Sequence, residues 1–212
     1  FIHGWGMNSA IWQPVIDVLS ADYEVHTVDL PGFAKNRQVS LDSYSIAEIA
    51  KLVVKAIDKP AIYIGWSLGG LVTLELALTF PERVLGLMTV ASTPCFLEKE
   101  AWPGIKPAVL KSFHRQLAED PAKTIKGFLK IQAMGSPHIR QDIKQITHLV
   151  MQHDMPSKET LDESLSLLET SDHRKHLASI QQPFLRLYGN NDSLVPKLVI
   201  EQIAILFLKE TA

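Results

Sequence analysis

The sequence contains a single cysteine, Cys95, among 212 residues. One cysteine cannot form an internal disulfide, so nothing in the composition requires an oxidising compartment. The sequence also lacks an apolar run of the roughly 18 residues that a membrane-spanning helix needs, and no signal-peptide pattern opens it. We therefore expect a cytoplasmic protein without a membrane anchor. Because the sequence starts with Phe1 and stops near an amphipathic stretch, we also expect both ends to be incomplete.

Charge of one sign is not in excess either, since 21 Lys and Arg stand against 23 Asp and Glu. A net charge of −2 gives no general attraction to nucleic acid or to an anionic membrane. The sequence has no HExxH or CxxC motif, no carboxylate cage and no phosphate-binding loop. It therefore predicts no metal and no cofactor.

Strand-like and helix-like segments alternate along the sequence. Residues 61–65 and 84–90 are short apolar runs typical of strands buried on both faces. Helices are predicted at 43–57, where Ser45 and Glu48 are spaced as a capping box, and at 68–80, which Pro81 ends. Further strands are expected at 23–29 and 184–188. This alternation predicts an α/β fold with a mostly parallel sheet flanked by helices.

Residues 97–175 interrupt the alternation, because they contain helical stretches but no convincing strand. Helices are expected at 107–117, 121–134 and 139–151. The block follows one strand and precedes the next, so we interpret it as a helical lid inserted into the core. The predicted organisation is therefore a core of 1–96, a lid of 97–175 and a second, incomplete part of the core at 176–212.

Ser67 is the candidate nucleophile, in the motif Gly65-Trp66-Ser67-Leu68-Gly69. The motif alone is a weak signal, but a buried strand before it and a long apolar helix after it are the context that a nucleophile elbow requires. A sharp turn there lifts the serine hydroxyl above the sheet. The alternative is a serine that merely caps the following helix.

Acyl transfer by a serine also needs backbone N–H groups that stabilise the oxyanion. The amide of Leu68, directly after the nucleophile, is one candidate. The loop His3-Gly4-Trp5-Gly6 resembles the HG-type loops that supply a second donor, so we assign that donor to the amide of Trp5. His3 is then a structural residue of the loop. We expect the Trp5 side chain either to line the pocket mouth or to pack in the core.

Asp192 is the candidate triad acid, because it follows Ser67 in the sequence and lies just after the predicted strand at 184–188. An Asn-Asn-Asp turn without catalytic function is the alternative. The triad histidine should come later still, but all eight histidines precede Asp192. We therefore expect the triad histidine beyond residue 212, and His173 and His176 to be structural or exposed.

The motifs GWSLGG, HGWG, DLPGF at 29–33 and FPER at 80–83 resemble those of the α/β-hydrolase superfamily. The segments at 91–96, 102–107, 128–132 and 183–189 resemble, more closely, the pimeloyl-[acyl-carrier protein] methyl ester esterase family of biotin synthesis. WPGIKP at 102–107 is far more specific than the elbow. The sequence departs from the family at Ala34, where glycine is usual, and at Asn36-Arg37, which puts that loop's conformation in question.

The resemblance implies a cytoplasmic carboxylesterase that cleaves a methyl ester from a pimeloyl group on an acyl-carrier protein. Implied site residues are Ser67 and Asp192 for the triad, Trp5 and Leu68 for the oxyanion, and Trp5, Ser67, Leu68, Phe128 and Gln132 for the substrate. A basic stripe that includes Lys123, with Arg140 and Lys144 beyond it, suits an acidic carrier protein, although a solvated lysine face is the better explanation for any single lysine. We expect a monomer.

Two other functions remain open at this stage. The same fold serves broad short-chain carboxylesterases, thioesterases and C–C bond hydrolases. The missing triad histidine also allows a catalytically inactive fragment that binds an acyl group or its carrier.

Overall fold

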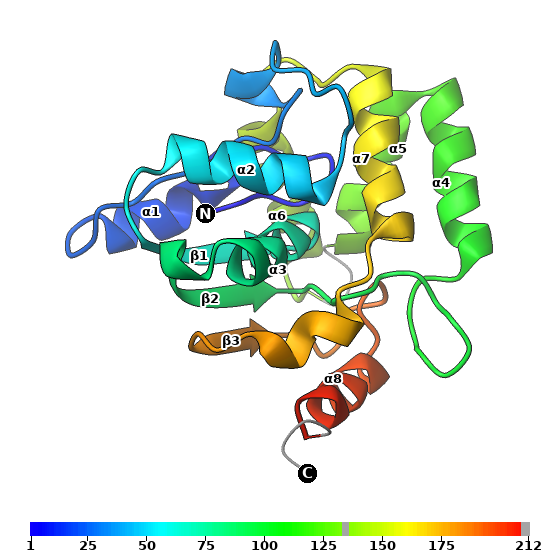
Figure 1. Cartoon of the computed structure of the whole chain (residues 1–212). Coiled ribbons are helices and arrows are strands. Elements are labelled where there is room, and N and C mark those ends of the chain that lie inside the picture. Colours follow the sequence, from blue (N-terminus) through cyan, green and yellow to red (C-terminus); the bar gives the residue numbers. More distant parts are fainter. Residues whose placement is uncertain (133–135, 209–212) are drawn as a thin grey trace.

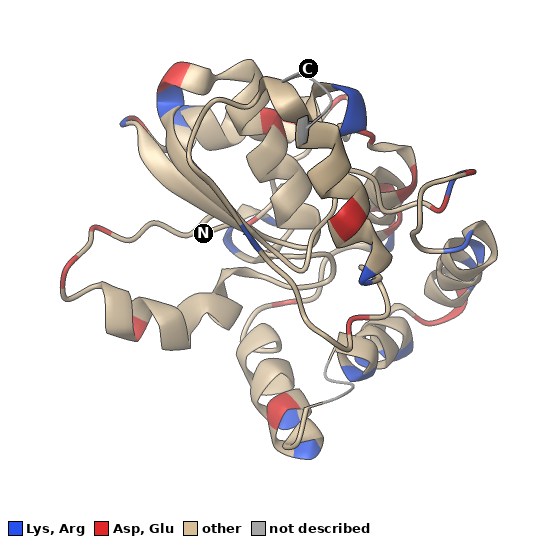
Figure 2. Ribbon diagram, turned by 90° about the horizontal axis from the view of Figure 1, so that it is seen from below, with Lys and Arg blue, Asp and Glu red and all other residues tan. Residues whose placement is uncertain are grey.

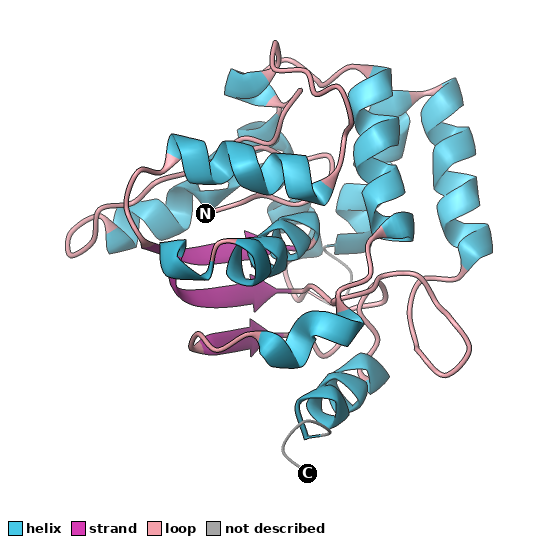
Figure 3. Ribbon diagram, viewed as in Figure 1, coloured by secondary structure: helices cyan, strands magenta, loops and turns pink. Residues whose placement is uncertain are grey.

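The computed structural model describes residues 1–132 and 136–208 of the chain. A three-stranded parallel sheet lies at its centre, in the order β1-β2-β3 (Figure 1, Figure 3). The strands are β1 (Ala61–Trp66), β2 (Val84–Val90) and β3 (Phe184–Leu187). Three of the four predicted strands are thus confirmed, and β3 ends one residue earlier than expected.

The fourth predicted strand, at 23–29, is wrong. Only Val28 forms a bridge in this segment, with Ile2, and its N–H donates to the carbonyl of Phe1. In the described residues, one isolated bridge does not make the ladder of paired residues that defines a strand. Ile2 also bridges to Gly65, so the start of the chain runs along the outer edge of β1.

Helix α3 (Leu68–Thr79) packs on β1 and β2, and α2 (Ile46–Ala56) packs on α3 (Figure 1). The Ser45 side chain accepts a hydrogen bond from the Glu48 N–H and caps α2, as the sequence predicts. Pro81 follows α3 and opens a short 3-10 turn. The other elements before β1 are η1 (Ser9–Trp12), α1 (Gln13–Leu19) and η2 (Ala34–Asn36). The 3-10 turn between α3 and β2 is η3 (Pro81–Arg83).

The face of the sheet opposite α3 is open to solvent in part. Ile62 is 63% exposed and Leu185 is 50% exposed. The prediction that the strand at 61–65 is buried on both faces is therefore wrong, because its period-2 alternation turns Ile62 away from α3. Tyr63, on the covered face, is buried.

In the part of the chain that the structure describes, four α-helices lie between β2 and β3: α4 (Pro107–Glu119), α5 (Pro121–Gln132), α6 (Ile139–Val150) and α7 (Lys158–Thr170). α4, α5 and α7 stand side by side (Figure 1), and α5 also packs on α6. The three predicted helices of this region are present, although Met134, the expected end of one, lies outside the described residues. α7 was not among the predicted helices. The boundaries at 97 and 175 stay a prediction.

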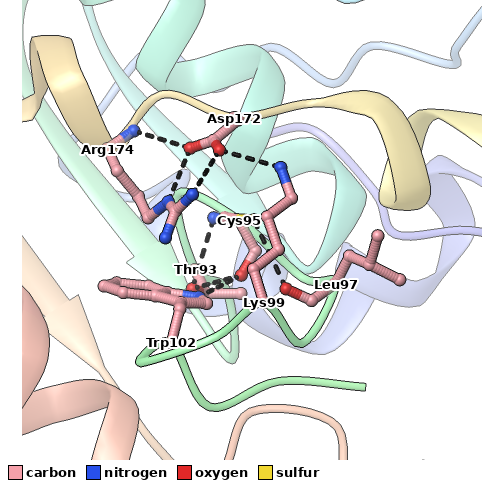
Figure 4. A network of polar contacts seen from close by, with 7 residues as sticks. All are labelled: Thr93, Cys95, Leu97, Lys99, Trp102, Asp172 and Arg174. Carbon is pink, nitrogen blue, oxygen red and sulfur yellow. Dashed lines mark hydrogen bonds and ion pairs between the residues drawn. The ribbon is translucent and has the colours of Figure 1, made fainter. Parts of the chain in front are cut away.

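The two chain crossings between the sheet and this helical region, which we call the lid, are tied together (Figure 4). The Asp172 carboxylate accepts hydrogen bonds from Lys99 Nζ (2.9 Å) and Arg174 Nη2 (2.7 Å). Burial alone would raise the pKa of Asp172, but these bonds hold it well below its usual range. Arg174 also lies over the ring of Trp102, whose indole N–H donates to the Cys95 carbonyl at 2.8 Å.

After the lid, η4 (Arg174–Ser179) leads into β3, and α8 (Leu198–Leu208) follows the strand. α8 packs on η4 (Figure 1). Within residues 1–132 and 136–208, no helix is both long enough and apolar enough to cross a bilayer.

Candidate active site

Ser67 occupies the turn between β1 and α3 in a strained backbone conformation, with φ 53° and ψ −116°. A positive φ is costly for a residue with a Cβ and persists only where the surroundings enforce it. The Ser67 side chain makes no capping bond to α3, which removes the alternative of a helix-capping serine. In the described part of the chain, no hydrogen bond engages its hydroxyl.

The packing around the turn explains how the strain is held. A Cβ at Gly65 would lie 2.2 Å from the Gly69 carbonyl oxygen, so only glycine lets strand and helix approach this closely. Ser92, just after β2, donates from Oγ to the Ser67 carbonyl at 2.8 Å. Sequence reasoning missed Ser92, which lies in the quoted segment 91–96 but carries no signal of its own.

The two candidate oxyanion donors flank Ser67. Leu68 is the first residue of α3, so its N–H has no acceptor within the helix. The Trp5 N–H donates to no backbone acceptor among the described residues. The loop that carries it lies against Ser67, because a Cβ at Gly4 would be 3.2 Å from the Ser67 Cβ. The oxyanion role of both amides stays a prediction.

His3 holds this loop from the core side, as expected of a structural residue. Its ring is fully buried, Nε2 accepts from the Leu30 N–H at 3.0 Å, and Nδ1 lies 2.8 Å from the Gly4 carbonyl. These partners require the neutral ring with its proton on Nδ1. Burial lowers the pKa of His3, although the backbone bond to Gly4 and the nearby Asp29 act in the opposite direction.

The Trp5 side chain does not line the pocket mouth, so of our two expectations the core-packing one is right. It is fully buried and donates from Nε1 to the Leu161 carbonyl of α7 at 2.9 Å. Its ring meets Phe128 edge-on at 5.0 Å. Phe128 is itself buried at this contact.

A cavity of about 460 Å³ opens at the carboxyl ends of the strands. Its wall includes Asp192 and Gln132, two of the predicted site residues, together with Trp66, which precedes the nucleophile. The remaining lining residues are Val90, Ala91, Ile131, Leu187, Tyr188, Gly189, Asn190, Asn191 and Leu194. In an open parallel sheet, ligands bind at this edge.

Asp192 follows β3, whereas Ser67 follows β1, with β2 between them. Asp192 Oδ1 accepts from the N–H groups of Leu194 and Val195, at 2.8 and 3.0 Å. These two bonds form the Asx-type turn that the sequence predicts as the alternative to a catalytic role. They engage only Oδ1 of the carboxylate. In the described ranges, no histidine ring bonds to Asp192. His173 is buried, with Nδ1 3.6 Å from a carboxylate oxygen of Glu75.

The candidate carrier contacts are at the surface of the lid. Lys123, Arg140 and Lys144 are exposed, while Phe128 faces inward. Charged residues lie mainly on helices and loops at the periphery (Figure 2). The described residues contain no group of three His, Cys, Asp or Glu side chains that could hold a metal ion.

Comparison with a family model gives a match to the alpha/beta hydrolase fold over residues 1–211. The chain belongs to the α/β-hydrolase family. The match agrees with a strained serine between a strand and a helix beside an HG-type loop. Ser67 is 4% exposed and does not itself line the cavity.

Two similar proteins in this family carry the name pimeloyl-[acyl-carrier protein] methyl ester esterase. The protein from Citrobacter koseri is 45% identical over 202 residues, which cover 95% of this chain and 78% of the relative. The protein from Yersinia enterocolitica is 44% identical over 198 residues, which cover 93% of this chain and 76% of the relative.

Solved structures are similar in fold. An esterase from Exiguobacterium antarcticum superimposes with a TM-score of 0.83 at 21% identity, covering 95% of this chain and 77% of that one. A hydrolase from Oleispira antarctica superimposes with a TM-score of 0.81 at 20% identity, covering 97% of this chain and 77% of that one. At this identity, the likeness establishes the α/β-hydrolase fold alone.

Proposed function

We propose that the chain is a carboxylesterase that hydrolyses the methyl ester of a pimeloyl group on an acyl-carrier protein in biotin synthesis. The observation that carries the proposal is the 44–45% identity, over 93–95% of the chain, to relatives that bear this name. The strained turn at Ser67 supports it, because such a turn presents a serine for attack on a carbonyl carbon.

In the proposed reaction, Ser67 Oγ attacks the ester carbonyl carbon and loses its proton to a general base. The carbonyl electron pair moves to oxygen, and the amides of Leu68 and Trp5 stabilise that charge. Collapse of the intermediate breaks the bond to methoxide, which takes the proton and leaves as methanol. Water then attacks the acyl-serine and releases the free carboxylate. Asp192 orients this base, a histidine in the proposed triad.

A direct test is methanol release from methyl pimeloyl-[acyl-carrier protein]. The full-length protein should release methanol, and Ser67→Ala should lower the rate by at least about three orders of magnitude. Ser40→Ala, a change at an exposed loop serine, is the matched control and should leave the rate unchanged. Equal rates for the full-length protein and its Ser67→Ala variant would end the proposal.

The alternative of an inactive binder is favoured by one observation, namely that among the described residues no histidine bonds to Asp192. Titration with a fluorophosphonate probe separates the two possibilities. An activated serine labels stoichiometrically at Ser67, whereas a binder without an activated nucleophile stays unlabelled but still retains the carrier protein in a pull-down.

Substrate choice within the fold is a separate question. We propose that Lys123, Arg140 and Lys144 contact the acidic carrier and that Gln132 contacts the acyl chain. Changing the three cations to Glu should raise KM for the carrier-bound ester by about tenfold and leave KM for a p-nitrophenyl ester unchanged. The control triple Lys51→Glu, Lys55→Glu and Lys59→Glu makes the same charge change on another part of the surface.

A broad short-chain esterase or thioesterase would instead prefer small free esters or thioesters over the carrier-bound ester in kcat/KM. A monomeric state and a cytoplasmic location stay predictions. Size-exclusion chromatography with light scattering tests the first of them.

A further inference from the structure

The oxyanion loop, which we define as residues 3–8, is held between the core and the lid. On its core side, a Cβ at Gly4 would come within 3.2 Å of the Ser67 Cβ, and the His3 ring accepts a hydrogen bond from Leu30. The loop therefore cannot move far toward the sheet without meeting the nucleophile.

On its other side, two side chains of the loop bond to the lid. Trp5 Nε1–H donates to the carbonyl of Leu161 in α7 at 2.9 Å. Asn8 Nδ2–H donates to the carbonyl of Val150 at the end of α6, also at 2.9 Å. Trp5 is fully buried and Asn8 is 5% exposed. Buried donors that lose their acceptors are costly, so these bonds resist separation of loop and lid.

Aromatic packing reinforces the same contact. The Trp5 ring meets Phe128 of α5 at 83°, and Phe128 in turn meets Phe113 of α4 with ring centroids 6.0 Å apart. All four lid helices are thus linked to the loop, directly or through one further ring. The hydrogen bonds of Trp5 and Asn8 fix the orientation of these side chains relative to the lid, which aromatic packing alone does not do.

We propose that the side chains of Trp5 and Asn8 are positioning residues, which set the direction of the Trp5 amide by bonding the oxyanion loop to the lid. The lid is then part of the support of the oxyanion hole, in addition to any role in covering the substrate. An amide turned away from the developing charge stabilises the transition state less but leaves substrate binding unchanged. The catalytic consequence rests on the proposed esterase function.

Trp5→Phe tests the proposal, because it keeps an aromatic ring and removes the indole donor. With p-nitrophenyl butyrate as substrate, kcat should fall by about tenfold while KM stays within about twofold. Trp102→Phe is the matched control, since it also removes a buried indole N–H that is bonded to a backbone carbonyl, that of Cys95. It should leave kcat within about twofold. An equal loss of kcat in both variants would overturn the proposal.

A second variant avoids the aromatic packing altogether. Asn8→Ser keeps a short oxygen that can cap η1, whose Ala10 N–H now donates to Asn8 Oδ1, but it removes the amide donor to Val150. It should lower kcat in the same way as Trp5→Phe. Unchanged kcat in Asn8→Ser would remove Asn8 from the proposal, and unchanged kcat in both variants would overturn it.

Hydrogen exchange tests the positioning without turnover, so it separates this proposal from the esterase function. Both Trp5→Phe and Asn8→Ser should speed amide exchange in residues 3–8 by at least about tenfold, whereas Trp102→Phe should leave those amides unchanged. Unchanged exchange in residues 3–8 of both loop variants would overturn the proposal, whatever the activity. If Ser67→Ala retains full activity, the esterase function fails while the exchange result still stands.

Discussion

The backbone of Ile2 passes so close to Gly69 that a Cβ on Gly69 would lie 2.4 Å from the Ile2 carbonyl oxygen. The first turn of α3 and the segment that leads into the oxyanion loop are therefore packed backbone to backbone. The spacing between Ser67 and the oxyanion loop depends on this contact. A shift of the α3 backbone would move Ser67, and a shift of the Ile2 backbone would move the loop.

Gly69→Ala should consequently disrupt the site. Because the obstructing atom is backbone and not the end of a flexible side chain, we expect a loss of roughly 2 kcal/mol or more in the free energy of unfolding, together with loss of esterase activity. Gly127→Ala in α5 is the control, since its added Cβ meets nothing within 4 Å. It should stabilise the protein by about 0.5–1 kcal/mol. Urea unfolding measures both, and a neutral Gly69→Ala would contradict the packing.

Ala34 stands where the resemblance to the family leads us to expect glycine, and its backbone conformation is one that favours glycine. Its φ is 39°, in the left-handed region that costs energy for a residue with a Cβ. Ala34→Gly should therefore raise the melting temperature by roughly 2–4 °C, equivalent to about 1 kcal/mol. Ala122→Gly, within helix α5, should lower it by a similar amount. A lower melting temperature for Ala34→Gly would show that the turn is not strained.

His3 should make stability depend on pH. Burial lowers the pKa of His3, so the unfolded chain, with a His pKa of about 6.5, takes up this proton before the folded chain does. The contribution of the neutral His3 to the free energy of unfolding is fully present above about pH 6.5 and is lost as the pH falls below that value. His173, whose pKa burial also lowers, acts in the same direction.

We therefore expect urea unfolding to give a smaller free energy at about pH 5.5 than at about pH 7.5. His3→Gln, which keeps an acceptor for Leu30 but does not titrate, should reduce this difference by about 1 kcal/mol. His148→Gln changes an exposed histidine of α6 and should leave the difference in unfolding free energy between the two pH values unchanged. If His3→Gln shows the full pH dependence, the ring of His3 is not held neutral.

Several parts of the fold could be predicted from the sequence because neighbours along the chain determine them. The Ser45 cap needs only the Glu48 amide three residues on, and the elbow at Ser67 needs only a strand, two glycines and a helix. The apolar runs of β1 and β2 gave those strands their correct positions. The same local logic failed at 23–29, because a strand also requires a partner of sufficient length.

The sequence by itself determined the fold family and the residues of the turn at Ser67. Only the tertiary structure decided that the Trp5 indole bonds to Leu161, 156 residues away, that the His3 ring bonds to Leu30, and that Ile62 is exposed. A residue type states which bonds a buried side chain can make. Which partner it meets depends on how distant segments pack, and that is a property of the whole fold.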